Sequence, residues 1–462
     1  MPKTVMNSLF YPNIFSFITL VLSINSLLLS TCYSIDEQGQ ALLTWKNSLS
    51  SPTDALKNWN SADSSPCKWL GIYCNSNEEV VNIFLNGVEL EGPLPSNFQS
   101  LKSLKNLTIS SCNLTGTIPK ELGEYRELTL IDLSDNSLSG EIPKEICRLN
   151  RLQSLCLNGN FLIKGEIPYC IGNLSSLSIL ALYDNQLSGK IPKTIGQLSK
   201  LQIFRAGGTY LEGELPMETG NCTNLVFLGF ACTNISGSIP SSIGMLKRIQ
   251  HLLLHETQLS GHIPEEIGNC SKLQYLFLYS TSISGPIPSQ IGSCKELIFI
   301  DVSTNLLNGS IPRSFVKLMK LQEVDLWGND FEGAIPEDFG NCTGLKIFDA
   351  SNNFLTGSIP RSFEKLVKLQ DLKLWNNSLV GAIPDYFGNY TELTFLDISR
   401  NLIMGSIPRS FGKLAKLQFL HLSVNQLSGI IPVEIVNCTK LINLTLGYNK
   451  FSGEFPAGPL AI

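Results

Sequence analysis

The sequence predicts an α/β solenoid, in which one structural unit is stacked many times along the chain. Sixteen prolines from Pro95 to Pro456 recur with a fixed period, because fourteen of their fifteen spacings are 24 residues and the other is 25. The residues around them follow the pattern LxxLxLxx(N/C/T)xLxGx(I/L)P. In segments such as Ile131-Asp132-Leu133 the alternation is that of a strand with apolar side chains inward and a polar one outward. Such a period indicates a unit that buries its apolar face only against its neighbours.

Residues 1–34 are predicted to be a secretory signal peptide. Lys3 precedes an apolar run from Ile14 to Leu29, which is short for a membrane span, and small residues follow up to Ser34. An uncleaved signal anchor is the less favoured interpretation. Beyond the signal peptide no stretch is long and apolar enough for a membrane helix.

Residues 35–82 are predicted to form an N-terminal cap. Leu42, Leu43 and Trp45 have helical spacing, which indicates a short amphipathic helix. The first core layer of a solenoid needs a cover. We expect the cap to supply it and to be held by a Cys67–Cys74 disulfide, which secretion permits.

Residues 83–456 comprise sixteen leucine-rich repeats of about 24 residues. Their strands are predicted to form a parallel sheet on the concave face. The Asn position, for example Asn136, should form a polar ladder that is weaker where Thr replaces Asn, from Thr209 to Thr281. Free buried thiols are favoured over bridges at a recurrent position six residues after the proline: Cys222, Cys270, Cys294, Cys342 and Cys438. Residues 457–462 form a tail without a polar cap, so the last apolar edge should be exposed or fray.

Composition excludes several function classes. A net charge of −5 without a Lys/Arg run gives no footprint for nucleic acid. There is no His-Arg-Asp motif and no glycine-rich loop followed by a strand lysine, so we expect no kinase and no other enzyme in this chain. His251 and His255 would be about 13 Å apart on a strand, too far for one metal ion, and no cofactor is predicted.

Twelve Asn-x-Ser/Thr sequons agree with a glycosylated extracellular surface. The alternative interpretation is repeat consensus, since six of them share one phase of the repeat. The sequons are Asn106, Asn113, Asn173, Asn221, Asn234, Asn269, Asn308, Asn341, Asn376, Asn389, Asn437 and Asn443.

The candidate ligand site begins in the repeat that contains Arg205, Gly207 and Gly208. A guanidinium beside accessible backbone N–H groups suits a sulfate, phosphate or carboxylate. The competing interpretation is that the glycines only relax a strand end and that Arg205 is solvated.

The outward positions of the neighbouring turns extend this candidate site. Exposed aromatic residues in a line imply a partner that covers them. Stacked carboxylates repel one another unless a cation lies among them, although Asp is also common consensus here. The aromatic candidates are Tyr183, His255, Phe277, Tyr279, Trp327 and Trp375, and the acidic ones are Asp301, Asp325 and Asp349.

The cap, the Cys-x6-Cys pair and the Gly-x-Ile-Pro repeats resemble the ectodomains of plant leucine-rich-repeat receptor kinases. Arg205-Ala-Gly207-Gly208, Asn221-Cys-Thr-Asn-Leu-Val-Phe-Leu-Gly and Gly405-Ser-Ile-Pro-Arg-Ser-Phe-Gly-Lys-Leu are similar to the root meristem growth factor receptor group. The resemblance implies an extracellular module, secreted or at the outer face of the plasma membrane. It also implies a small secreted peptide ligand on the concave face, with a sulfated tyrosine near Arg205.

The resemblance has limits. Such receptors continue through further repeats, an Arg-x-Arg strand, a membrane helix and a Ser/Thr kinase, whereas this sequence ends at Ile462. Signalling would therefore need a co-receptor kinase or the remaining part. Two other interpretations stay open: a secreted inhibitor or defence protein that binds a protein partner on the same face, and a gene fragment without a stable product.

Overall fold

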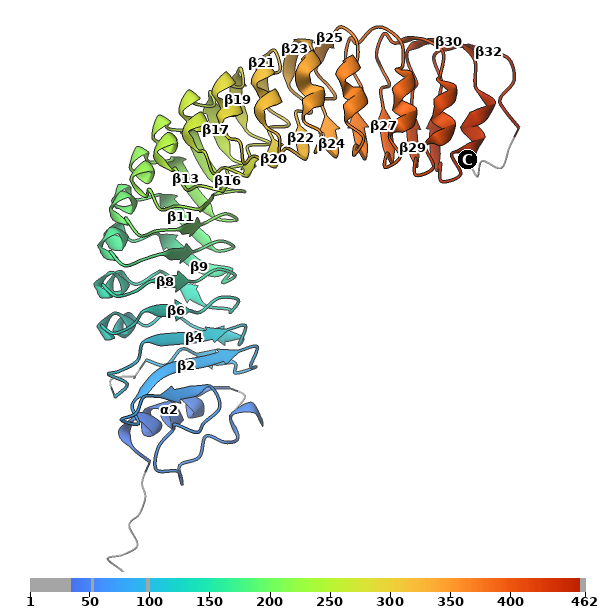
Figure 1. The fold of residues 1–462 in the computed structure, drawn as a ribbon. Coiled ribbons are helices and arrows are strands. Elements are labelled where there is room, and N and C mark those ends of the chain that lie inside the picture. Colours follow the sequence, from blue (N-terminus) through green and yellow to red (C-terminus); the bar gives the residue numbers. More distant parts are fainter. Residues whose placement is uncertain (1–34, 51–53, 97–99, 458–462) are drawn as a thin grey trace, which may run out of the picture.

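The chain forms a curved solenoid (Figure 1). The computed structural model describes residues 35–50, 54–96 and 100–457, so the predicted signal peptide and residues 458–462 lie outside the described residues. The strands of the largest sheet line the inner side of the arc and short helices cover its outer side. The predicted fold class is confirmed. None of the described helices is both long and apolar enough to cross a membrane.

The N-terminal cap covers the first strands of the solenoid. Its α-helix α2 (Glu37–Ser48) begins after Asp36, whose carboxylate accepts the Gly39 N–H at 2.7 Å as an N-cap. The buried face of α2 includes Leu42 and Trp45. Strand β1 (Ile72–Cys74) pairs antiparallel with β2 (Val80–Asn86) and closes the edge of the sheet.

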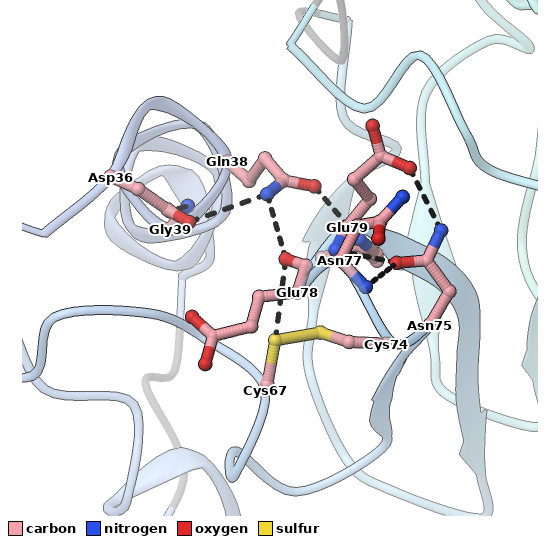
Figure 2. The surroundings of a disulfide bond; sticks show 10 residues. Asp36, Gln38, Gly39, Cys67, Cys74, Asn75, Asn77, Glu78 and Glu79 are labelled. Atoms are coloured by element: carbon pink, nitrogen blue, oxygen red, sulfur yellow. Dashed lines mark hydrogen bonds between the residues drawn. A yellow bond between two sulfur atoms is a disulfide. The ribbon is translucent and has the colours of Figure 1, made fainter.

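The Cys67–Cys74 disulfide is present in this cap (Figure 2). The Gln38 side chain of α2 lies beside it, donates to the Glu78 carbonyl at 3.2 Å and accepts the Val80 N–H at 2.8 Å. Helix, disulfide loop and second strand are therefore joined by one polar network.

In the described part of the chain seventeen strands form the concave sheet, in which each strand from β2 onward pairs in parallel with the equivalent strand of the next turn. Most registers join residues 24 positions apart, for example Phe204 with Leu228. In spatial order the strands are β1 (Ile72–Cys74), β2 (Val80–Asn86), β4 (Asn106–Ser110), β6 (Leu130–Asp132), β8 (Ser154–Cys156), β10 (Ile179–Ala181), β12 (Ile203–Arg205), β14 (Phe227–Gly229), β16 (His251–Leu253), β18 (Tyr275–Phe277), β20 (Phe299–Asp301), β22 (Glu323–Asp325), β24 (Ile347–Asp349), β26 (Asp371–Lys373), β27 (Phe395–Asp397), β29 (Phe419–His421) and β31 (Asn443–Thr445).

The later part of each repeat contributes a second set of parallel strands. A ten-stranded sheet contains β7 (Ser139–Gly140), β9 (Leu162–Glu166), β11 (Gln186–Lys190), β13 (Tyr210–Glu214), β15 (Asn234–Ser238), β17 (Gln258–Gly261), β19 (Ser282–Gly285), β21 (Leu306–Gly309), β23 (Asp330–Ala334) and β25 (Phe354–Thr356). Smaller sheets contain β3 (Gly92–Pro93) with β5 (Leu114–Thr115), and β28 (Met404–Gly405) with β30 (Gln426–Ile430) and β32 (Lys450–Ser452).

The outer helices are short 3₁₀ turns that begin after the repeat proline. Many carry a glycine because the next turn packs closely: a Cβ on Gly220 would lie 2.4 Å from the Ser242 carbonyl oxygen. They are η2 (Lys120–Glu124), η3 (Lys144–Arg148), η4 (Tyr169–Asn173), η5 (Lys193–Gln197), η6 (Met217–Asn221), η7 (Ser241–Met245), η8 (Glu265–Asn269), η9 (Ser289–Ser293), η10 (Arg313–Lys317), η11 (Glu337–Asn341), η12 (Arg361–Lys365), η13 (Asp385–Asn389), η14 (Arg409–Lys413) and η15 (Val433–Asn437), whereas η1 (Asp54–Leu56) lies in the N-terminal cap.

The predicted polar ladder runs through the core. Asn353 donates to the carbonyls of Leu326 and Ala350 at 3.0 and 3.2 Å, and its Oδ1 accepts the Phe331 N–H at 3.0 Å. Thr233 at the same position makes a single bond, to the Phe230 carbonyl at 2.8 Å. The ladder is thus weaker in the turns where Thr replaces Asn.

The thiols at the recurrent position are free and buried, as at Cys222, where burial raises the thiol pKa to about 12. A second disulfide, Cys147–Cys170, joins η3 to η4 across the one turn of 25 residues. Sequence reasoning did not identify this bond, because neither cysteine shares the phase of the others.

The last repeat exposes apolar surface. Leu444 and Leu446 are half-buried, whereas Leu420 and Leu422 at the same positions one turn earlier are 0% exposed.

Candidate ligand site on the concave sheet

Each strand of the concave sheet has three outward positions, of which sequence reasoning followed only the second and third. The first position holds Phe227, His251, Tyr275 and Phe299 on the consecutive strands β14 to β20. The period-two alternation of a strand could have revealed this row two residues before the Arg205 position. The aromatic surface is therefore wider than the sequence-based candidates suggested.

Arg205 ends β12 and is half-buried between two aromatic rings. Its guanidinium carbon lies 4.1 Å from the centre of the Tyr183 ring and 5.1 Å from that of Phe227. No carboxylate of the described residues comes within ion-pair distance of it. Arg205 is thus a stacked cation without a counter-charge.

The two glycines after Arg205 have structural roles. A Cβ on Gly207 would lie 2.7 Å from the carbonyl oxygen of Ala231 on the next turn. Gly208 has a φ of +61°, at a position where other turns also take the left-handed conformation, for example Asp184 at +57°. A Cβ on Gly208 would overlap the Asp184 carboxylate.

The expectation that the Gly208 amide is open to an anion is wrong. Its N–H donates to the Ala231 carbonyl at 2.8 Å within the sheet, and Asp184 places negative charge beside it. Recognition of an anion here would therefore rest on the edges of the Arg205 guanidinium.

A continuous stack extends from Arg205 along the sheet. Phe227 stacks on His251 with ring centres 5.1 Å apart, and His251 stacks on Tyr275 at 4.7 Å. Burial lowers the pKa of His251, which keeps the ring neutral to lower pH. With Tyr183 on the other side of Arg205, five successive turns each contribute one planar group to this stack.

A second aromatic group lies toward the ends of the middle strands. His255 stacks on Tyr279 at 4.3 Å and meets the Phe277 ring edge-on at 5.9 Å. Burial lowers the pKa of His255, against the opposing effects of Glu256 and Asp301. These residues lie between Arg205 and the acidic positions.

The acidic positions divide into carboxyl groups with a basic neighbour and carboxyl groups without one. Lys373 lies 3.5 Å from Asp349 and His421 lies 3.3 Å from Asp397, so these two carboxylates have basic neighbours. Among the described residues neither Asp301 nor Asp325 has an ion-pair partner. Of the three acidic positions predicted from the sequence, they are the two without a basic neighbour.

The environment of these two carboxyls disfavours ionisation. Asp301 accepts the Ser303 N–H and hydroxyl at 3.0 and 2.7 Å, yet burial raises its pKa. Burial, with further contributions from Asp349 and Asp301, raises the pKa of Asp325 from 3.8 to about 7, although the Trp327 N–H donates to its Oδ1 at 2.9 Å. A ligand cation would favour their charged forms.

The two tryptophans lie in and beside the acidic turns, Trp327 in the turn of Asp325 and Trp375 in the turn after that of Asp349. Trp327 is 38% exposed and Trp375 is half-buried, two turns further on. No cluster of three or more metal-ligating side chains occurs in the described part of the chain. The tripeptide Asp338-Phe339-Gly340 has the sequence of a kinase motif, but Phe339 is 1% exposed in the core at η11, so the tripeptide belongs to the repeat.

The sequon asparagines differ in their surroundings. Most are exposed, for example Asn173 and Asn221 at the ends of η4 and η6. Asn106 is half-buried in β4 and accepts the Thr129 hydroxyl at 2.8 Å, and Asn341 is half-buried with a bond from Lys365.

Comparison with known families agrees with the architecture. The Leucine rich repeat N-terminal domain family matches residues 35–75, and Leucine rich repeat families match 103–124, 127–149, 176–198, 319–379 and 367–427. The LRR receptor-like serine/threonine-protein kinase RGI3 of Arabidopsis thaliana is 51% identical over 77 residues, which are 16% of this chain and 7% of that protein.

Two solved structures resemble the whole solenoid. The plant peptide hormone receptor RGFR1 in complex with RGF2 has a TM-score of 0.76 and 47% identity over 84% of this chain and 65% of that chain. The Arabidopsis receptor kinase HAESA, solved with the peptide hormone IDA and the co-receptor SERK1, has a TM-score of 0.55 and 29% identity over 91% of this chain and 87% of that chain. This chain thus spans about two thirds of the RGFR1 chain. The chain has a leucine-rich-repeat fold and is similar to the ectodomains of plant leucine-rich-repeat receptor kinases.

Proposed function

We propose that this chain is the extracellular ligand-binding module of a receptor and recognises a small secreted peptide along its concave face. The observation that carries the proposal is Arg205, a stacked guanidinium without a counter-charge on the inner sheet. It lies at one end of an aromatic surface that leads to Asp301 and Asp325, two carboxyl groups without a basic neighbour. The similarity to peptide hormone receptors supports this assignment.

We propose further that a sulfated tyrosine of the peptide contacts Arg205, and that the aromatic and acidic positions contact later, basic residues. The peptide would act at the outer face of the plasma membrane or in the apoplast. Signalling would require a kinase, supplied by a co-receptor or by further sequence of the receptor, in line with the SERK1 complex of HAESA.

The test is binding of the secreted chain to a panel of short peptides, RGF2 included, with each tyrosine-containing peptide synthesised with and without O-sulfation. Arg205→Ala should weaken binding of a sulfated peptide about 10- to 100-fold, because it removes a charge-assisted hydrogen-bonding group. Arg248→Ala is the matched control, since Arg248 is an exposed arginine bonded to Asn224 at 2.9 Å. Equal losses for sulfated and unsulfated peptides would contradict the proposal.

The alternative is a secreted inhibitor or defence protein that binds a folded protein partner. The exposed Trp327 favours it, because exposed tryptophans often anchor protein interfaces. A partner of this kind would lose affinity with Trp327→Ala and tolerate Arg205→Ala, whereas a sulfated peptide would show the reverse.

A further inference from the structure

The positions beside Arg205 are occupied by small residues. In the register of the sheet Arg205 pairs with Ala181 on one side and with Gly229 on the other. At this outward position other turns carry Phe277 or Asp301, which would fill the space above the strand. The small side chains at these two positions therefore leave room on both sides of Arg205.

Two aromatic rings fill the space that these small residues leave. A Cβ on Gly229 would lie 2.9 Å from Cε1 of Phe227, so the ring of Phe227 occupies the volume of the missing side chain. Phe227 reaches Arg205 from the first outward position of β14, and Tyr183 reaches it from two residues beyond the Ala181 position of β10. The guanidinium lies between rings that approach along opposite diagonals.

This arrangement limits how a ligand can approach. The hydrogen-bond donors of a guanidinium lie in its plane. Rings on both faces leave these edges as the route to its N–H groups and reduce the number of rotamers that the side chain can visit. The stacks with His251 and Tyr275 support Phe227 from its other side.

We propose that Phe227 and Gly229 are positioning residues, which together with Tyr183 and Ala181 hold the Arg205 guanidinium edge-on for a tetrahedral oxyanion such as a sulfate ester. The ligand part of this inference rests on the proposed function. The position of the Arg205 guanidinium between the Tyr183 and Phe227 rings is a property of the unliganded protein and can be tested without a ligand.

The first readout is NMR of the unliganded chain with labelled arginine, in which the Arg205 resonances are assigned by their loss in Arg205→Lys. Ring currents from Tyr183 and Phe227 should shift the Arg205 side-chain protons upfield. Phe227→Leu should reduce this shift and Phe227→Tyr should restore it. Gly229→Ala should disturb it, because the added methyl group displaces the ring. Phe419→Leu is the control, since Phe419 occupies the same strand position on β29 and packs against Phe395.

The second readout is the ratio of affinities for a sulfated peptide and its unsulfated form, with thermal melting to verify folding. Phe227→Leu should lower affinity for the sulfated form about three- to tenfold, in proportion to the lost stacking, and leave the unsulfated form nearly unchanged. Phe227→Tyr should recover the wild-type ratio.

The outcomes separate the two ideas. If Phe227→Leu changes the Arg205 shift no more than Phe419→Leu does, or weakens both peptide forms equally, the positioning role is wrong. A wild-type protein that shows the shift without preferring sulfated peptides would overturn the proposed function and the oxyanion assignment. The positioning of Arg205 by the two rings would then still be supported.

Discussion

Replacement of Asp325 by asparagine should stabilise the protein at neutral and alkaline pH and leave its stability unchanged in acid. Burial and the neighbouring carboxyls raise the pKa of Asp325 from 3.8 to about 7. In the unfolded chain the group releases its proton near pH 4, whereas in the folded chain it keeps it to about pH 7. The folded state therefore loses stability as pH rises between these values. Asparagine stays neutral and its oxygen can still accept the Trp327 N–H.

The magnitude follows from the size of the pKa change. A folded pKa of about 7 corresponds to roughly 4 kcal/mol when the carboxyl is fully ionised, and partial solvent contact reduces this to on the order of 2 kcal/mol. Urea unfolding at pH 8.0 and pH 4.0, followed by circular dichroism, measures the difference.

The matched control is Asp349→Asn, which removes a carboxylate that has Lys373 at 3.5 Å. This variant should not gain stability at pH 8. The reasoning would be refuted if Asp325→Asn were neutral or destabilising at pH 8, or if it stabilised the protein equally at both pH values.

Three further predictions concern the scaffold. Asn353→Ala should cost about 2–4 kcal/mol in urea unfolding because it leaves several buried backbone groups unpaired, whereas Thr233→Ala should cost about 1 kcal/mol; similar costs would contradict the ladder's gradient. Removal of the Cys147–Cys170 disulfide by paired Ser substitution should destabilise the chain by about 2–4 kcal/mol, visible as a lower melting temperature, and no change would show the bond to be dispensable. Glycopeptide mass spectrometry should find Asn106 less occupied than the exposed sequons, because its amide is half-buried and bonded to Thr129.

The periodic part of the fold was predictable because the residue at each repeat position makes equivalent packing contacts in every turn. The proline phase identified the turns, and the Asn and Thr positions gave the strength of the ladder. The Cys147–Cys170 bond was not predictable from this pattern, because it depends on how two adjacent 3₁₀ turns meet across the irregular repeat.

The placement of the candidate residues on the concave sheet followed from the repeat phase, but their contacts did not. Arg205 emerged from the sequence because it departs from the repeat, yet the covering of its faces depends on side-chain directions across neighbouring strands. The charge of the acidic positions was overestimated, because their burial and ion pairs also depend on side-chain directions across neighbouring strands. Sequence shows that Asp349 and Lys373 fall on the same track, but only the structure shows that they pair while Asp325 does not.

Because the repeat is uniform, the strands of the concave face are evenly spaced and fix the distance between groups on different turns. Arg205 on β12 and Asp325 on β22 are five strand steps apart, through β14, β16, β18 and β20. At about 4.8 Å per step this is roughly 24 Å, or about seven residues of an extended peptide. Deletion of residues 240–263 would join Ile239 to Pro264, remove one repeat with its strand and keep every repeat contact in phase. A peptide that spans both groups would then fit best when it is shorter by one or two residues between its anionic and cationic ends.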